Sequence, residues 1–281
     1  MLRWRFGNHD LDLTHRGIIM GIVNVTPDSF SDGGRFNDHG RAVEHAFMLL
    51  EEGADILDIG GESTRPGAEP VDEAEELRRV LPVIRAVRSQ TKALISIDTM
   101  KAVVARAALD AGADIINDVT GLRADAAMLR VAAESSAGIV VMHMTGTPQT
   151  MQVKPHYEDV VREVSDYFEH RLRLLENEGI TPERVVLDPG FGFGKALDHN
   201  LELMRSLPGL ATQRPLLIGV SRKSMIGKVL HSDEMEDRFW PTIALTAHAR
   251  EHGARIVRVH DVKPNRESLW MMEAILIGLR A

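Results

Sequence analysis

The sequence predicts an α/β fold, a single (β/α)8 barrel, from three observations. Short runs of β-branched and other apolar residues recur eight times, segments with helical periodicity separate them, and glycines often close a helical segment before the next run. Near-continuous apolar strands that alternate with helices form a parallel sheet covered by helices. Eight such units in 281 residues are typical of a closed barrel, so we expect one domain over residues 1–281.

The expected elements follow one another along the chain. At the start, Gly7 and Asn8 predict the turn of a short N-terminal β-hairpin. Helix-ending glycines are expected at Gly53, Gly112, Gly179 and Gly253. The expected strands of the barrel are residues 18–24, 55–60, 93–98, 114–119, 138–144, 184–190, 215–221 and 255–260.

An open, doubly wound sheet is the main alternative to the barrel. Such sheets often carry the nucleotide-binding patterns G-x-G-x-x-G or G-x-x-x-x-G-K followed by Ser or Thr. Residues 190–195 read GFGFGK and match neither pattern, and neither occurs elsewhere in the sequence. The sequence therefore favours the barrel.

Composition narrows the function. The net charge of −8 argues against a nucleic-acid partner, which needs a basic surface. The sequence has no cysteine, which excludes disulfides and thiolate metal sites. No run approaches the roughly 20 apolar residues that span a bilayer, and no apolar run follows the early arginines as in a signal peptide. We expect a cytoplasmic protein without a membrane partner.

Polar residues finish nearly every expected strand. Because the carboxyl ends of barrel strands meet at one opening, here called the mouth, these side chains are expected to share a site. The residues are Asn24, Asp58 with Glu62 beyond it, Asp98, Asn117 with Asp118, His143, Asp188, Ser221 to Lys223, and Arg258 with His260.

Each of these residues also has a structural interpretation. Asp98 could cap the following helix, and Asp188 could belong to a turn. Lys223 could be a solvated surface charge, and His260 a hydrogen-bonded core histidine. Arg258 is harder to dismiss, because it interrupts an apolar strand where an unpaired charge is costly. Capping does not explain polar endings in phase on so many strands, so the set indicates function.

Two loops at the mouth add to this hypothesis. Residues 60–76 form a long, glycine-bracketed segment that could be a mobile lid or a plain surface loop. Residues 221–228 read SRKSMIGK and place hydroxyls and cations where a strand passes into a helix, a favourable place for an anion.

Eight segments of the sequence resemble the dihydropteroate synthase family of pterin-binding (β/α)8 barrels. They occur in the family's order and cover essentially the whole chain. The segments are MGIVNVTPDSFSDGG (20–34), DIGGESTRPGA (58–68), ISIDT (95–99), ADIINDVTG (113–121), VVMHMTGTPQTMQ (140–152), LDPGFGFGK (187–195), SRKSMIG (221–227) and RVHDV (258–262).

The resemblance implies that 6-hydroxymethyl-7,8-dihydropterin diphosphate and p-aminobenzoate condense to 7,8-dihydropteroate and diphosphate. It implies that Asp188 accepts two hydrogen bonds from the pterin edge, while Asp98 and Asn117 bind the remaining ring nitrogens and Lys223 donates to the acceptor side. Residues expected to pack on the ring faces are Met142, Ile116 or Ile22, and Arg258, whose guanidinium also points charge towards the diphosphate.

The same resemblance implies a diphosphate site and a magnesium ion. Arg65, Arg258 and His260 are expected around the leaving diphosphate, with Thr64 taking part in loop closure. Asn24 is the expected protein ligand of Mg2+, which prefers few protein ligands together with phosphate and water oxygens. The catalytic set implied is Asp98, Asp188, Lys223, Arg65, Arg258 and His260.

For p-aminobenzoate, the resemblance implies an aromatic wall and an anion cradle. Phe30 and Pro66 on the two mobile loops are expected to line the ring with Phe193 and Thr64. Ser224 is expected to hold the carboxylate.

Four positions next to the expected site depart from the family pattern: Met100, Ala102, Phe191 and Pro241. They bear on loop geometry and on affinity for p-aminobenzoate or sulfonamides. Residues 268–279 read SLWMMEAILIGL, a helix apolar over more of its surface than one barrel needs, so a homodimer is expected, in agreement with the family.

Two alternatives to a synthase remain. A methyltetrahydrofolate methyltransferase would share the pterin-binding Asp and Asn but would have no use for the loops around residues 29–34 and 63–67. A barrel that binds pterins without turnover, in a regulatory role, would keep the same residues.

Overall fold

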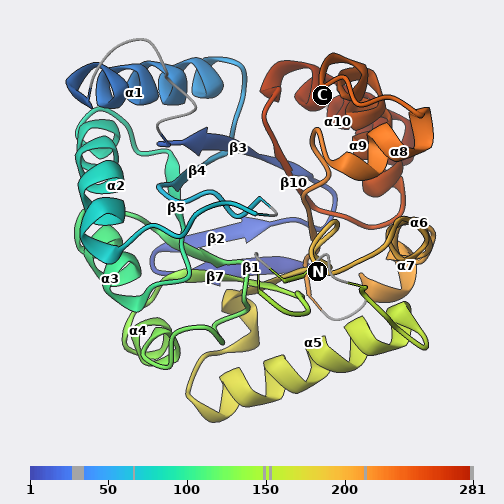
Figure 1. Ribbon diagram of the computed structural model, residues 1–281, viewed down its shortest axis with the longest axis horizontal. Coiled ribbons are helices and arrows are strands. Elements are labelled where there is room, and N and C mark those ends of the chain that lie inside the picture. The colour runs from blue at the N-terminus through green and yellow to red at the C-terminus, as the bar shows by residue number, and fades with distance from the viewer. Residues whose placement is uncertain (27–34, 66, 148–149, 152–153, 212–213, 279–281) are drawn as a thin grey trace.

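The computed structural model describes residues 1–26, 35–65, 67–147, 150–151, 154–211 and 214–278. Figure 1 looks into the barrel, whose strands lie at the centre of a ring of helices. Eight parallel strands are hydrogen-bonded in the order β8-β7-β6-β5-β4-β3-β10-β9. A bridge between Leu187 and Leu216 joins the two outermost strands of this order and closes the barrel. The predicted (β/α)8 barrel is confirmed.

The strands coincide with the predicted segments: β3, β4 and β5 end at the predicted residue, and the other five end one to three residues earlier. The shortest is β9, because the chain turns after it: the Lys223 amide donates to the Val220 carbonyl at 3.1 Å, and Arg222 adopts a positive φ of 58°. The strands of the barrel are β3 (Ile18–Asn24), β4 (Ile56–Gly60), β5 (Leu94–Asp98), β6 (Ile115–Asp118), β7 (Gly138–Met142), β8 (Val185–Asp188), β9 (Leu217–Ile218) and β10 (Ile256–Val259).

Helices cover the outside of the barrel. The predicted helix-ending glycines are confirmed: Gly53, Gly112, Gly179 and Gly253 have φ of 101°, 108°, 80° and 102°, a region that favours glycine. None of the described helices is long and apolar enough to cross a membrane. The α-helices are α1 (Arg35–Glu51), α2 (Glu73–Arg88), α3 (Ala102–Asp110), α4 (Met128–Glu134), α5 (Val160–Asn177), α6 (Leu197–Arg205), α7 (Leu207–Leu210), α8 (Ser224–Leu230), α9 (Phe239–Glu251) and α10 (Val262–Ile277), with short 3-10 turns at Pro182–Arg184 and Glu236–Arg238.

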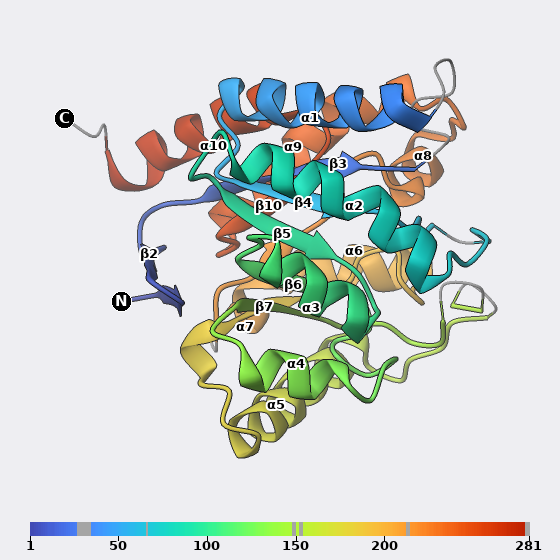
Figure 2. The same cartoon turned by 90° about the vertical axis from the view of Figure 1, so that its left-hand side faces the viewer.

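The predicted N-terminal hairpin closes the end of the barrel at which the strands start (Figure 2). Its strands β1 (Arg3–Phe6) and β2 (His9–Asp12) pair antiparallel around Gly7 and Asn8. Trp4 is fully buried, and its indole N–H donates to the Arg184 carbonyl at 2.8 Å. Trp4 and Phe6 pack against the first inward-facing residues of the strands, which are Ile18, Met20, Ile56, Leu94, Ile115, Val140, Val186, Leu217 and Ile256.

The alternation of side chains along each strand determines which residues face the interior between this apolar plug and the mouth. Successive side chains point to opposite faces of a strand, so residues two positions apart share a face. Asp58 follows Ile56 in this way, Asn117 follows Ile115, Asp188 follows Val186, and Arg258 follows Ile256. The polar residues that end the strands therefore line the interior of the barrel one layer above the plug.

Candidate active site

At the centre of the mouth, one arginine lies between two carboxylates. Arg258 Nε donates to Asp58 Oδ2 at 2.6 Å, and Arg258 Nη2 donates to Asp98 Oδ2 at 2.7 Å. The Asn117 amide donates to the same Asp58 oxygen at 3.1 Å. Asp58 is fully buried, and its Oδ1 has no hydrogen-bond partner among the described residues. Strands β4, β5, β6 and β10 thus contribute to one network, although Arg258 and Asp58 are 200 residues apart.

Burial sets the protonation of this network. Burial raises the pKa of Asp98 to about 7, against the opposing charge of Arg258. Burial lowers the pKa of Arg258, but the nearby Asp58 and Asp98 carboxylates outweigh it and raise that pKa above its usual value. Arg258 is therefore a permanent cation that holds two carboxylates in place. The capping interpretation of Asp98 is wrong, because the residue that precedes α3 as its cap is Lys101.

Asp188 ends β8 and is also buried. Its Oδ1 accepts a hydrogen bond from the Gly190 amide at 2.7 Å, so the turn interpretation is correct for one of its two oxygens. Burial raises the pKa of Asp188, while the Gly190 hydrogen bond and the charges of Lys223, Lys195 and Arg258 lower it. The carboxylate thus lies within electrostatic range of the cations of the mouth.

Lys223 lies between β9 and α8, as the cap residue of that helix. Its ammonium donates to the Phe191 carbonyl and lies 4.1 Å from the centre of the Phe193 ring. Burial lowers the pKa of Lys223 to about 7, against the charge of Asp188. This cation is therefore held inside the mouth by the loop that follows β8.

A buried lysine that the sequence did not point to holds this loop. Lys195 is 2% exposed, and its ammonium lies 3.0 Å from His143 Nδ1. It also donates to the carbonyls of His143, Gly190 and Phe193 at 3.0–3.2 Å. Burial lowers the pKa of Lys195 to about 7 and the pKa of His143 to about 2, so His143 accepts from the lysine as a neutral ring. The only sequence signal was the position of Lys195 at the end of the glycine-rich segment 190–195.

On the other side of the mouth, His260 follows β10. The Ser221 hydroxyl lies 3.0 Å from His260 Nδ1 and also accepts from the His260 amide at 3.2 Å. Burial lowers the pKa of His260 to about 3, and the charges of Arg258, Arg222 and Arg65 lower it further. His260 is thus a neutral hydrogen-bonding group here, and positive charge in this part of the mouth comes from arginines.

The loop after β4 is anchored by buried charges. Lys101 donates to Glu62 and to Glu76 at 2.5 Å each, and Glu76 is fully buried on α2. Beyond this anchor Thr64 is half-buried and Arg65 is exposed. Phe30 and Pro66, both expected beside p-aminobenzoate, lie outside the described residues.

The remaining expected residues lie at strand ends or just beyond them. Asn24 ends β3 beside Gly60, and Ser224 is exposed at the start of α8. Met142 ends β7 and packs with Val119, Met144 and Met151, against which Phe193 lies half-buried. Ile116 faces the helices and packs in the outer core, so only Ile22, of the two isoleucines, lies in line with the interior residue Met20.

The four departures from the family pattern have local explanations. Ala102 begins α3, and its amide, which a proline would lack, donates to Asp125 at 2.8 Å. Pro241 lies in the first turn of α9, where backbone amides have no helical partner to lose. Phe191 is fully buried in the core, and Met100 packs against the methionine cluster. None of the four side chains displaces a charged residue of the mouth.

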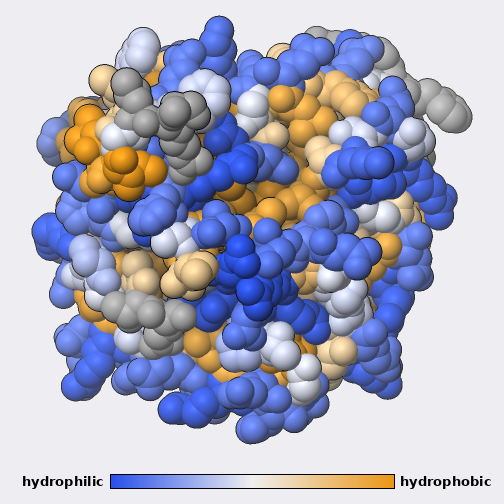
Figure 3. Space-filling model, turned by 180° about the vertical axis from the view of Figure 1, so that it is seen from behind, coloured by the Kyte–Doolittle hydropathy of each residue, from blue (hydrophilic) through white to orange (hydrophobic). Residues whose placement is uncertain are grey.

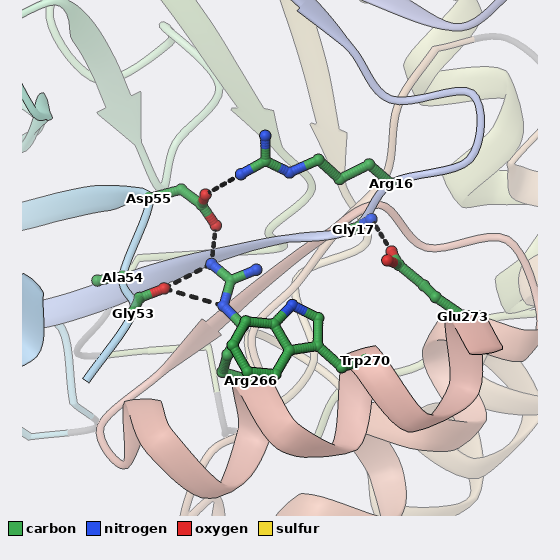
Figure 4. A pocket seen from close by; sticks show the side chains of 8 residues that line it. All are labelled: Arg16, Gly17, Gly53, Ala54, Asp55, Arg266, Trp270 and Glu273. Atoms are coloured by element: carbon green, nitrogen blue, oxygen red, sulfur yellow. Dashed lines mark hydrogen bonds and ion pairs between the residues drawn. The ribbon is translucent and has the colours of Figure 1, made fainter. Parts of the chain in front are cut away.

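A separate hollow of about 420 Å3 lies at the start of β3 and β4 beside α10 (Figure 4). Its charged groups bind one another: Asp55 accepts from Arg16 at 2.5 Å and from Arg266, and Glu273 accepts from the Gly17 amide. These pairs stabilise the start of the barrel, and the hollow is not the candidate active site.

Comparison with known proteins agrees with this geometry. Residues 20–260 match a family model described as pterin binding enzyme. A dihydropteroate synthase of Escherichia coli strain K12 is 48% identical over 267 residues, which cover 95% of this chain and 94% of that protein.

Two solved structures of a Xanthomonas albilineans dihydropteroate synthase are also similar. The structure with 4-aminobenzoic acid has a TM-score of 0.91 and 44% identity, covering 98% of both chains. The complex with 7,8-dihydropteroate has a TM-score of 0.88 and 42% identity, covering 98% of this chain and 99% of that one.

Proposed function

The chain belongs to the dihydropteroate synthases of the pterin-binding enzyme family, and we propose how the residues of its mouth perform their reaction. The reaction condenses 6-hydroxymethyl-7,8-dihydropterin diphosphate with p-aminobenzoate and releases diphosphate, a transfer step of folate biosynthesis. The observation that carries the proposal is the set of buried Asp58, Asp98, Asn117 and Asp188 with the half-buried Arg258 at the carboxyl ends of the strands.

The pterin ring binds deepest, because its donor edge requires buried acceptors. Asp188 accepts two adjacent N–H groups of the ring, as a carboxylate can do side by side. Asp98 and Asn117 bind further ring nitrogens, and Lys223 donates to the acceptor side. Their fixed partners, Arg258 for Asp98 and the Phe191 carbonyl for Lys223, support this arrangement by orienting the groups before substrate binds.

Bond cleavage at the pterin methylene leaves a cation that the electron-rich ring delocalises. The carboxylates beside the ring stabilise this charge more strongly than they stabilise the neutral substrate, which is what lowers the barrier. The p-aminobenzoate amine then attacks the methylene, and the mouth contributes by holding it in line. No strong general base is needed for this order of events, which fits a half-buried, neutral His260.

The leaving diphosphate needs positive charge and hydrogen-bond donors. Arg65 and Arg258 supply the charge, and His260 and Thr64 supply hydrogen bonds. Asn24 offers one amide oxygen at the end of β3, a donor set that suits Mg2+ when substrate phosphates and water complete its coordination. Mg2+ bound there would supply positive charge opposite the diphosphate.

The p-aminobenzoate ring lies at the outer part of the mouth. Phe193 provides one wall of this part of the mouth. The Lys195 ammonium donates to the Phe193 backbone carbonyl and so holds this residue in place. Ser224 takes the carboxylate at the start of α8. Phe30, Pro66 and Thr64 complete the wall when the first two loops close.

Product formation tests this proposal. Diphosphate release should require the pterin diphosphate, p-aminobenzoate and Mg2+ together, and should stop when EDTA removes the metal. A barrel that only binds pterins would take up the pterin diphosphate without releasing diphosphate under any of these conditions, and that result would reject the catalytic assignment.

We also propose that the enzyme is a homodimer that uses α10. Trp270, Met271 and Ile275 are 61–67% exposed on this helix, and Leu276 and Ile277 at its end are also exposed. Figure 3 shows hydrophobic side chains gathered on this part of the surface. Sedimentation velocity at micromolar concentration should give a dimer, and Ile275→Asp should shift it towards the monomer. A wild-type monomer would reject the proposal. We further propose that the chain forms one domain and that the enzyme is cytoplasmic. Limited proteolysis should then yield no stable fragment smaller than the barrel, and cell fractionation should recover the enzyme in the cytoplasmic fraction.

A further inference from the structure

The last turn of α9 carries two histidines and a glutamate at metal-binding spacing. His248, Glu251 and His252 are related as i, i+3 and i+4, so they share one face of the helix. Each offers one ligand atom, and these atoms all lie within 4.8 Å of one another. We propose that this cluster binds a divalent transition metal ion of the zinc class, at a site separate from the mouth.

The hydrogen bonds of both rings leave the right nitrogens for a metal. His252 Nδ1 lies 2.8 Å from the His248 carbonyl, and His248 Nε2 lies 3.3 Å from the Met204 carbonyl. A carbonyl can only accept, so each of these nitrogens carries the proton. The lone pairs therefore remain on His252 Nε2 and His248 Nδ1. Metal-binding histidines are oriented in this way, with the second ring nitrogen donating to a carbonyl or carboxylate.

The two rings stack on each other, with centroids 4.0 Å apart and planes inclined by 27°, and both side chains are half-buried. Because imidazole lone pairs lie in the ring planes, the rings must turn out of this stack before both nitrogens can bind one ion. The stack keeps the two side chains next to each other, so the turn that is required is a local one. Glu251 is exposed and can move to supply a third ligand, and water can supply a fourth.

The donor set selects the class of metal. Two imidazole nitrogens with one carboxylate oxygen suit Zn2+, Ni2+ or Cu2+, whereas Mg2+ prefers oxygen ligands alone. Residues 248–252 read HAREH, and histidines four residues apart on a helix form the zinc-binding pair of several metalloenzymes.

The location separates this site from the proposed catalytic metal. The C-terminal end of α9 leads through Gly253 into the start of β10, at the opposite end of the barrel from the mouth. All three ligands come from the end of α9, so a metal ion here would hold the last turn of that helix, next to the end of α6, whose Met204 carbonyl accepts from His248. It should stabilise the fold and leave the chemistry of the mouth unchanged.

Zinc titration of the tag-free full chain tests the proposal. Isothermal titration calorimetry with ZnCl2, in a non-chelating buffer with excess Mg2+, should show about one zinc ion per chain. The double variant His248→Gln/His252→Gln should bind zinc at least about tenfold more weakly, and His170→Gln, which removes an exposed histidine on α5, should bind as the wild type does. Zinc should also raise the thermal unfolding midpoint of the wild type but not of the double variant.

Two controls keep the test decisive. The double variant without zinc should keep the wild-type rate of diphosphate release, because neither histidine belongs to the mouth. Its unfolding midpoint without zinc is the baseline for its own response to zinc, because the variant also loses the ring stack and two hydrogen bonds. Absence of a zinc isotherm in the wild type, or an identical isotherm in the double variant, would overturn the proposal.

Discussion

At the end of the barrel where the strands start, Trp4 and Phe6 fill the interior with apolar side chains, whereas two residues further along the same strands the interior is lined by Asp58, Asn117, Asp188 and Arg258. Both ends are buried, and both are built by the same alternation along the strands. They differ in what burial does. Apolar burial at the start stabilises the fold, by roughly 25 cal/mol for each Å2 removed from water.

Charge burial at the mouth works differently. The attraction between Arg258 and its two carboxylates roughly offsets the cost of removing all three from water, so the network adds little net stability. Its consequence is chemical, because burial raises the pKa of Asp98 and lowers that of Lys223, each to about 7. One end of the barrel thus mainly stabilises the fold, and the other mainly sets the pKa values of the site. Substitutions at the start of the strands should therefore change the free energy of unfolding, and substitutions at the mouth should change binding and activity.

The largest expected effect is on stability, from removal of the plug. Trp4→Ala should lower the free energy of unfolding by about 3–5 kcal/mol, because it leaves a cavity in a fully buried site and an unpaired Arg184 carbonyl. Urea denaturation measures the change. Trp240→Ala, which removes an indole that is 74% exposed, is the matched control and should change stability by no more than about 0.5 kcal/mol.

Activity per folded molecule sharpens this test. Under conditions in which Trp4→Ala is folded, its kcat and KM should match those of the wild type, because Trp4 packs in the apolar layer at the start of the strands. A folded Trp4→Ala protein with a strongly reduced kcat would show that the two ends are coupled after all.

At the mouth, Asp188→Asn should have the opposite signature. Pterin affinity should fall by about 100-fold or more, since the variant loses charge-assisted hydrogen bonds and presents an amide donor to a donor edge. The free energy of unfolding should not fall, because burial raises the pKa of Asp188 and thus already penalises the ionised carboxylate in the folded state. Calorimetric titration with a pterin measures the first effect and urea denaturation the second, with the exposed Asp198→Asn as control. Near-normal pterin affinity would reject the role of Asp188.

The sequence predicted much of this division, because local patterns encode it. Apolar runs marked the strands, glycines marked the ends of helices, and polar residues in phase at the strand ends marked the mouth. The interior side of each strand then follows from alternation alone. The same rule shows why Ile116 does not reach the site, since it precedes the inward-facing Asn117 by one residue.

Contacts between distant segments could not be read in this way. Asp58 shares Arg258 across 200 residues, and Lys195 lies next to His143 across 52. No periodicity connects such residues, and a lysine in a polar loop is normally solvated. Lys195 is buried because three carbonyls and a histidine nitrogen converge on it, which only the folded loop produces.

Within the mouth, the loop after β4 and the buried residues of the barrel should contribute to different steps. Arg65→Ala should lower kcat by roughly 10- to 100-fold, the value of one or two charge-assisted hydrogen bonds to the leaving diphosphate. Binding of a pterin without diphosphate should change little, because Arg65 is exposed on the loop and not part of the buried carboxylate set. Steady-state kinetics and pterin titration measure the two effects, with Arg173→Ala, an arginine 69% exposed on α5, as control. Equal losses in both measurements would count against a role confined to the diphosphate.

The smallest expected effect is a pH dependence centred near neutrality. Burial raises the pKa of Asp98 to about 7, so this carboxylate loses its charge as the pH falls below that value. Burial lowers the pKa of Lys223 to about 7, so this ammonium loses its charge as the pH rises above it. If the pterin needs an ionised Asp98 and a charged Lys223, kcat/KM should peak near pH 7 and fall by up to about tenfold per pH unit on either side.

The Asp98→Asn variant tests whether Asp98 causes the decrease in kcat/KM at acid pH and Lys223 the decrease at alkaline pH. The variant should have a lower maximum but no acid decrease from Asp98, while the alkaline decrease from Lys223 should remain. Ionisation of the substrates affects both proteins alike, so the difference between the two profiles reports Asp98. His260 should contribute nothing between pH 5 and 8 in the free enzyme, since burial lowers its pKa to about 3. A wild-type profile that is flat from pH 6 to 8 would mean that burial at the mouth does not set the chemistry, and would remove the contrast between the two ends of the barrel.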